Sequence, residues 1–170
     1  MKTTRQSKTS TFGNLSKTCL QEPKKSRKTS KTLMRKINKI IIHCTATPEG
    51  REHDVADIRR WHLKRGFNDI GYHFLVHIDG TVEYGRPIKK SGAHTSGQNK
   101  NSIGIAYVGG MSKDMKKAKD TRTKEQKDAL VKLIQELIYT HNKDMQIFGH
   151  RDFANKACPS FDARKEYAIL

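Results

Sequence analysis

The sequence predicts an α/β domain in which a mixed central β-sheet is flanked by helices. Three observations lead to this prediction. Short apolar segments rich in β-branched residues recur along the chain, two segments with helical periodicity lie between them, and a hairpin signal stands near the middle. At 170 residues, the chain has room for one domain with a single core. We therefore expect one ordered domain over residues 37–170.

The first elements of this domain are a strand and a helix. Residues 39–43 form an apolar run that is typical of a buried strand. Asp54 offers an N-cap and Gly66 a stop, so a helix is predicted over residues 54–65.

A hairpin and a further strand follow. Residues 73–78 and 81–84 flank Asp79 and Gly80, a dipeptide that favours a type I′ hairpin turn. Residues 102–108 then read as another strand, which ends at a pair of glycines.

The last part of the domain contains a long amphipathic helix. A lysine-rich loop leads to Thr123 and Gln126, which form a capping box. Apolar residues then recur at helical spacing and predict a buried stripe: Leu130, Leu133, Ile134, Leu137 and Ile138. A short strand over residues 146–148 delivers His150 into a loop.

The N-terminal segment differs from the rest of the chain in charge. Residues 1–36 hold 11 Lys and Arg against one acidic residue, Glu22, so they carry +10 (11 − 1) of the total +17. Few apolar residues are available there to offset the entropy of ordering, so we expect a disordered basic tail. Such a tail can bind nucleic acid or another anionic polymer, or remain a solvated arm. Met34 is an alternative natural start.

Targeting signals and disulfides are not expected. No apolar core of a signal peptide follows the basic start, and no segment is long and apolar enough to span a bilayer. We therefore expect synthesis in the cytoplasm. Cys19, Cys44 and Cys158 are odd in number and lack CxxC pairing, which argues against a disulfide framework. One of these thiols can then serve as a metal ligand.

Two histidines stand where strands end. His43 ends the first strand, His150 follows the last strand, and Cys158 comes eight residues later. Residues just past strand ends point into the ligand crevice of such a sheet. Three zinc ligands with an open fourth position are typical of a catalytic site. A lone histidine is usually structural, but Tyr72 and Lys156 add reactive groups to this set.

Four sequence blocks resemble a known family. They are IIIHCTAT, GYHFLVHIDGTVEYGRP, GAHTSGQNKNSIGIAYVGG and GHRDFANKACPSFD, in that order. The chain is similar over residues 37–164 to the zinc amidases that include phage amidase-type lysozymes and peptidoglycan recognition proteins. Nothing in residues 1–36 matches them.

The resemblance implies a role for each matched residue. His43, His150 and Cys158 are expected to hold one Zn²⁺ per chain, with Tyr72 and Lys156 as the catalytic side chains. The implied reaction is hydrolysis of the amide between N-acetylmuramic acid and L-alanine in peptidoglycan. This substrate follows from the resemblance alone, because spacing and composition indicate only metal-assisted hydrolysis.

Chemistry gives these side chains distinct tasks. Lys156 can place an ammonium beside the oxyanion of the tetrahedral intermediate. Tyr72 can hold the attacking water or donate a proton to the leaving amine. The general base stays open among Tyr72, Lys156 and the water on the metal.

Several other residues are candidates for the substrate groove or for packing. The family counterpart of His94 lies in the substrate groove, and we add His73 and Thr95 as candidate substrate contacts. His73 can equally pack beneath the site. Cys44 neighbours His43 along a strand and should point to the opposite face as a buried thiol. Arg86 is expected to brace a turn rather than to bind the stem peptide.

The expected role is that of a monomeric phage or prophage endolysin, which would need a holin-like partner or a secretion route to reach the wall. The alternative is a peptidoglycan-binding module that has lost catalysis. Such a loss accompanies replacement of the cysteine ligand. The presence of Cys158, Tyr72 and Lys156 favours the enzyme.

Overall fold

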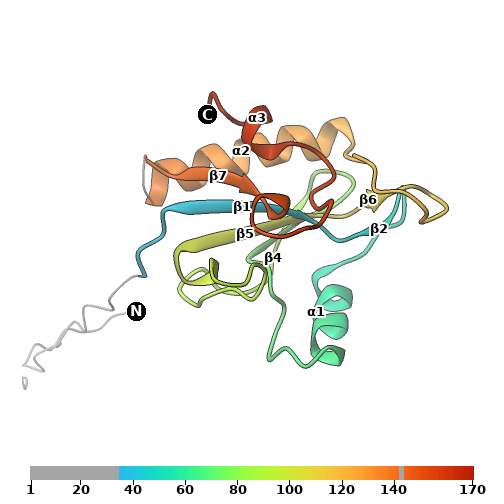
Figure 1. The fold of residues 1–170 in the computed structure, drawn as a ribbon, viewed down its shortest axis with the longest axis horizontal. Helices are drawn as coiled ribbons and strands as arrows, with labels where there is room; N and C mark the ends of the chain where they lie inside the picture. Colours follow the sequence, from blue (N-terminus) through green and yellow to red (C-terminus); the bar gives the residue numbers. More distant parts are fainter. Residues whose placement is uncertain (1–34, 142–143) are drawn as a thin grey trace, which may run out of the picture. The chain divides into compact units, whose positions relative to one another are not determined.

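The computed structural model describes residues 35–141 and 144–170. Within these residues, the main sheet has five strands in the order β4-β3-β5-β1-β7, and only its β3–β4 pair is antiparallel (Figure 1). These strands are β1 (Lys39–Cys44), β3 (Phe74–Val76), β4 (Val82–Tyr84), β5 (Ser102–Tyr107) and β7 (Gln146–Gly149). A small parallel sheet joins β2 (Thr47–Pro48) to β6 (Gly110–Met111). The predicted mixed sheet is confirmed.

Helices cover both faces of this sheet (Figure 1). Helices α2 (Lys124–His141) and α3 (Ala163–Glu166) lie on one face, and α1 (Val55–Lys64) lies on the other. Two 3₁₀ turns, η1 (Asn99–Asn101) and η2 (His150–Asp152), flank β5 and β7. The predicted helices and strands are therefore present, and where both bounds were predicted they agree or differ by one or two residues.

Alternation along β1 divides its side chains between the two faces. Ile40, Ile42 and Cys44 pack in the cluster that contains the buried stripe of α2. His43 points the other way, because neighbouring side chains of a strand leave on opposite faces. The prediction that Cys44 is a buried thiol facing away from His43 is confirmed.

Both long helices begin as their caps predict. The Thr123 hydroxyl accepts a hydrogen bond from the Gln126 backbone N–H (3.0 Å), and the Gln126 side chain accepts one from the Thr123 N–H (3.1 Å). At α1, Asp54 accepts from the Asp57 N–H at 2.7 Å. Gly66 follows this helix with a φ of +84°, which suits a glycine stop.

The hairpin turn differs from the prediction. A type I′ turn needs positive φ at both central residues, but of Asp79 and Gly80 only Gly80 has one, at +84°. The Gly80 N–H donates to His77 O, and the His77 N–H donates to Thr81 O. The strands are therefore joined by a three-residue loop that ends in a left-handed glycine.

The predicted tail lies outside the described residues except for its last two. Arg35 is bound to the domain, since its guanidinium donates to the backbone carbonyls of Ile88 (2.6 Å), Lys100 (3.0 Å) and Ser102 (2.9 Å). We therefore propose that the domain starts at or before Arg35 rather than at residue 37.

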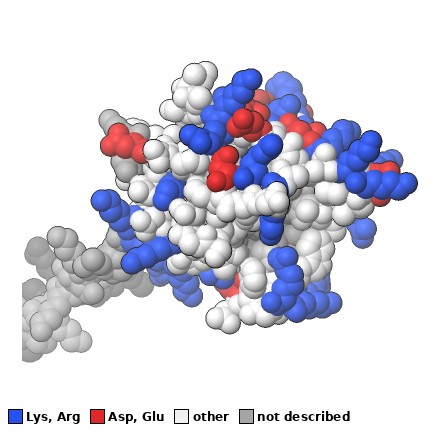
Figure 2. Space-filling model, in the orientation of Figure 1, with Lys and Arg blue, Asp and Glu red and all other residues white. Residues whose placement is uncertain are grey.

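The visible surface of the domain is mixed in charge. Figure 2 shows basic side chains spread over several elements, with acidic side chains among them. Among the described residues, no helix is long and apolar enough to cross a bilayer.

Candidate metal centre and active site

The parallel register of β1 and β7 brings two predicted ligands together. Ile42 lies opposite Gly149, so His43 and His150 follow in step at the ends of the two strands. Their ring centroids are 4.7 Å apart. The His43 side chain is fully buried, whereas that of His150 is partly exposed. Residues that are 107 positions apart in sequence thus share one end of the sheet.

A tight loop returns the third predicted ligand to these histidines. The Arg151 N–H donates to Cys158 O at 2.7 Å and closes the loop, while the Tyr107 hydroxyl donates to Pro159 O at 2.6 Å. The Cys158 sulfur lies 3.8 Å from His43 Nδ1, and the Cys44 N–H points at this sulfur from 3.3 Å. A backbone donor of this kind favours a thiolate.

This donor set fits Zn²⁺. Ligand atoms of His43, His150 and Cys158 all lie within 4.8 Å of one another. Zinc bonds of about 2.0–2.1 Å to nitrogen and 2.3 Å to sulfur place tetrahedral N and S ligands about 3.6 Å apart. The observed 3.8 Å between His43 Nδ1 and Cys158 Sγ is close to this value. Two imidazoles and a thiolate leave one tetrahedral position for water or substrate.

The electrostatic surroundings keep both histidines available as neutral ligands. Burial lowers the pKa of His43 well below its ordinary value, and nearby His94 and His150 act in the same direction. Burial, followed by the charge of Lys156, lowers the pKa of His150. A hydrogen bond with Cys44 and burial raise the pKa of the Cys158 thiol, so binding of a cation there releases a proton.

The two predicted catalytic side chains lie near different members of the ligand set. The Tyr72 ring centroid is 5.1 Å from that of His43. Burial, then the neighbouring Cys158 and Cys44 thiols, raises the pKa of Tyr72, so its phenol stays protonated at neutral pH. Lys156 is exposed and lines a groove together with His150. Tyr72 is therefore suited to donate a hydrogen bond, and Lys156 to supply a positive charge.

The tyrosine is held by its neighbours in the chain. Gly71 passes so close to the next segment that a Cβ there would lie 2.4 Å from Ala93 O. Arg86 donates to the carbonyls of Ile70 (2.7 Å) and Ser91 (2.8 Å). This supports the prediction that Arg86 braces a turn.

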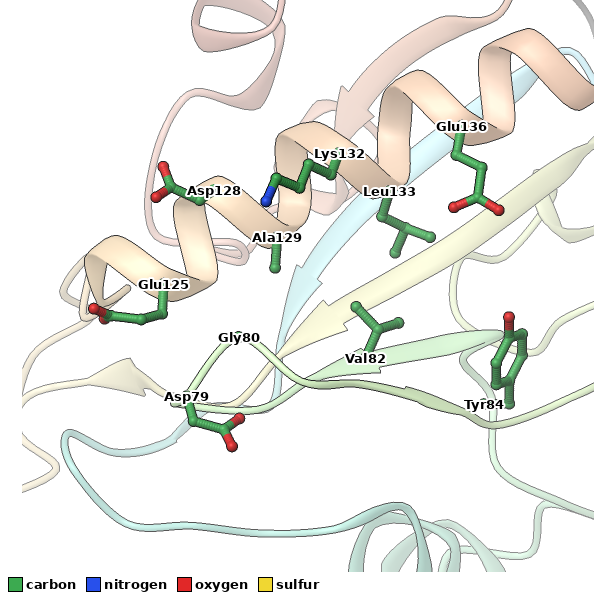
Figure 3. A pocket seen from close by; sticks show the side chains of 10 residues that line it. All are labelled: Asp79, Gly80, Val82, Tyr84, Glu125, Asp128, Ala129, Lys132, Leu133 and Glu136. Carbon is green, nitrogen blue, oxygen red and sulfur yellow. The ribbon is translucent and has the colours of Figure 1, made fainter.

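A groove of about 390 Å³ runs past this site, and its lining includes Phe67, His94, Thr95, His150, Phe153 and Lys156. A larger groove of about 460 Å³ lies between α2 and the β3–β4 hairpin (Figure 3). The larger groove has an acidic rim and none of the predicted site residues. The candidate active site is therefore assigned from the side chains that line the groove and not from the volume of the groove.

The three predicted substrate contacts are placed differently. His94 and Thr95 line the groove although their side chains are mostly buried. His73 is fully buried, accepts from the Gly104 N–H at 2.9 Å, and lies 3.0 Å from an Arg35 nitrogen. We therefore propose that His73 packs beneath the site, which is one of the two roles that the sequence left open for it.

Some residues that organise the site were missed in the sequence. Asn99 accepts from the N–H groups of His94 (2.8 Å) and Thr95 (2.9 Å) through its side-chain oxygen. Ser102 lies 3.3 Å from His94 Nε2. No periodicity marks these loop and strand-start residues, and their partners are known only once the chain is folded.

Comparison with known proteins agrees with this geometry. The family model of N-acetylmuramoyl-L-alanine amidases matches residues 33–161, which is more than half of the chain. The chain belongs to this amidase family. The resemblance of the four sequence blocks is thereby confirmed.

Relatives of this amidase include phage and animal proteins. The endolysin of Enterobacteria phage K11 is 39% identical over 79% of this chain and 87% of its own length. The solved amidase LysC of Clostridium intestinale is 29% identical, with a TM-score of 0.63 over 77% of this chain and 81% of its own. A bumblebee protein, PGRP-SA, is 30% identical, with a TM-score of 0.66 over 79% of this chain and 81% of its own.

Proposed function

We propose that this amidase hydrolyses the bond between N-acetylmuramic acid and L-alanine in peptidoglycan with one Zn²⁺ held by His43, His150 and Cys158. The observation that carries this proposal is the convergence of these three ligand atoms within 4.8 Å, beside a groove that Lys156 also lines. Similarity to phage endolysins supports lysis of the bacterial cell wall as its role.

The ion and the protein side chains would divide the chemistry. Zinc at a site of this kind lowers the pKa of a bound water and polarises a carbonyl oxygen. Lys156 would stabilise the negative charge that develops on the amide oxygen, because its ammonium is exposed in the groove. Tyr72 would act as a hydrogen-bond donor to the water or the substrate, since its raised pKa keeps the phenol protonated.

This assignment narrows the choice of general base. A phenol that is still protonated at neutral pH cannot accept a proton from water, so we propose that Tyr72 positions a reactant rather than serving as the base. The substrate polymer would enter through the groove that His94 and Thr95 line.

Peptidoglycan binding without hydrolysis is the second candidate. The similarity to PGRP-SA favours it, because related proteins are named for peptidoglycan recognition. The complete set of Cys158, Tyr72 and Lys156 favours the enzyme.

Digestion of purified peptidoglycan separates the two candidates. The protein is incubated with the polymer with added zinc or with chelator, and mass spectrometry identifies the released products. We expect intact stem peptides with a free N-terminal L-alanine, released only when zinc is present. Zinc-loaded protein that binds the polymer but releases no peptide would refute hydrolysis and support recognition.

A further inference from the structure

His94 lies directly beside the metal ligand His43. The two imidazoles meet edge to face, with His43 Nε2 3.0 Å from His94 Nδ1 and an interplanar angle of 84°. The other ring nitrogen of His43 faces the Cys158 sulfur. The contact with His94 thus occupies the nitrogen of His43 that does not face the metal centre.

Hydrogen bonds continue from His94 into the protein. His94 Nε2 lies 3.3 Å from the Ser102 hydroxyl, and this hydroxyl lies 2.8 Å from Gln98 O. The four groups form a chain that runs from His43 through His94 and Ser102 to the Gln98 carbonyl. Its members come from β1, the loop before η1 and the start of β5.

The last member determines the direction of the whole chain. A carbonyl oxygen can only accept a hydrogen bond, so the Ser102 hydroxyl must donate to Gln98 O. The Ser102 oxygen is then free to accept from His94 Nε2–H. Because a neutral imidazole carries one N–H, His94 Nδ1 is left as an acceptor for His43 Nε2–H.

The position of the Thr95 hydroxyl agrees with this direction. It lies 3.1 Å from His94 Nδ1 and 3.4 Å from His43 Nε2. Its oxygen can therefore accept a second hydrogen bond from His43 Nε2–H.

The backbone passes close to the His94 ring at two glycines. A Cβ at Gly92 or at Gly104 would lie 2.5 Å from His94 Cδ2. Asn99 additionally fixes the loop by accepting from the backbone N–H of His94. The ring therefore fits a slot that two glycines create.

We propose that His94 is a positioning residue that fixes the tautomer of His43, so that the lone pair of His43 Nδ1 faces the metal centre. The inference rests on the proposed zinc site, because it assigns His43 Nδ1 as the ligand atom. His94 then acts through His43, whereas the sequence predicted contact with the substrate. Hydrogen-bond partners of this kind orient metal-binding histidines and strengthen them as ligands.

The test compares His94→Phe with His94→Asn. Phenylalanine keeps a ring in the slot but offers no acceptor, whereas the asparagine amide oxygen can occupy the place of His94 Nδ1. We expect His94→Phe to weaken zinc binding about 10- to 100-fold in competition with a chelator. We expect His94→Asn to recover most of this loss. His141→Phe, the same change at the distant end of α2, should leave the affinity unchanged.

Nuclear magnetic resonance of ¹⁵N-labelled histidines gives a second readout that does not depend on activity. In the zinc-loaded wild type, His43 should show a proton on Nε2 and the metal on Nδ1. Ser102→Ala keeps His94 in place and removes only its acceptor, so it should lower zinc affinity less than His94→Phe does. It therefore provides a test even where His94→Phe does not fold.

The outcomes separate this inference from the proposed function. The role of His94 alone would be overturned if folded His94→Phe or Ser102→Ala bound zinc through His43 with unchanged affinity. It would also be overturned if His43 of the zinc-loaded wild type carried its proton on Nδ1. Wild-type protein that binds no zinc would overturn the proposed metal site together with this inference.

Discussion

Cys158 illustrates how a single side chain can complete a metal centre. Its sulfur lies 3.8 Å from His43 Nδ1 and would supply the negative charge of the proposed ligand set. The neighbouring thiol of Cys44 packs on the face of the sheet that α2 covers. Two cysteines in the same region thus have different expected roles.

Replacing Cys158 by alanine should abolish zinc binding and amidase activity together. Only two imidazole ligands would remain, which are too few to retain the ion against a chelator. Metal analysis after dialysis and release of stem peptides check the two effects. The control is Cys44→Ala, which should keep the zinc. A fully active Cys158→Ala protein would contradict the proposed site.

Replacing Lys156 by alanine should separate metal binding from catalysis. Lys156 is exposed in the groove, so its loss should leave zinc content unchanged. Activity should fall about 100- to 1,000-fold if the ammonium stabilises an oxyanion. Peptide release under saturating zinc measures this change, with Lys116→Ala as the control for loss of a surface charge. Equal activities of the two variants would exclude the proposed role of Lys156.

At the scale of the secondary-structure elements, Arg122 connects the loop before α2 to α3. Its side chain is 1% exposed and pairs with Asp120 (2.8 Å) and Glu166 (2.7 Å). Its guanidinium also lies 3.3 Å from the centre of the Phe161 ring. Phe161 follows the loop of Cys158, so this cluster supports the segment that carries the proposed third ligand.

The variant Arg122→Met should lower the free energy of unfolding by about 3 kcal/mol. It leaves two carboxylates without their buried cation. Urea unfolding at pH 7 measures the change. The matched control is Arg59→Met, which breaks a pair with Asp69 whose side chains are 39% and 34% exposed, and should change stability by less than about 1 kcal/mol. Similar values for both variants would contradict the structural role of Arg122.

The same cluster predicts a pH dependence of stability. Burial by itself would raise the pKa of Asp120, but hydrogen bonds from Arg122 outweigh it and lower the pKa. A carboxyl whose pKa is lower in the folded state stabilises the fold above its unfolded pKa of about 3.9. This contribution is lost as the pH falls through the folded pKa.

Asp120→Asn should therefore flatten the loss of stability between about pH 5 and pH 3. Urea midpoints across this range provide the measurement. Asp128→Asn, which removes an exposed pair with Lys124, should flatten this loss of stability less. The prediction fails if the two variants show the same pH profile.

At the scale of the whole molecule, the proposed metal site joins distant parts of the chain. His43 and Cys158 are 115 residues apart, and both approach the end of β1. An ion that binds the folded chain more tightly than the unfolded chain stabilises the entire domain.

Zinc should therefore raise the melting temperature of the protein. At a free concentration of 100 times Kd, the stabilisation is about 2.7 kcal/mol. For a domain of this size, that corresponds to roughly 10 °C. Differential scanning calorimetry with zinc and with chelator tests this, and Cys158→Ala should show no rise. A wild-type melting temperature that zinc leaves unchanged would count against a folded-state metal site.

Local sequence patterns were sufficient to predict most of the fold. The β-branched run of β1, the cap at Asp54 and the capping box of Thr123 and Gln126 each depend on residues close in sequence. The turn at Gly80 was predicted less well. There the backbone passes so near α2 that a Cβ would lie 2.8 Å from Glu125 O, so tertiary packing contributes to the loop geometry.

The candidate site, like the fold, could be predicted from the sequence only in part. The sequence by itself determined the amidase family, and it predicted the ligands His43, His150 and Cys158 and the catalytic candidates Tyr72 and Lys156, because these residues stand in ordered blocks that resemble the family. Only the tertiary structure decided that His73 is enclosed and that His94 contacts His43. A hydrogen bond between residues 51 positions apart depends on how strands and loops pack, and no local pattern records it.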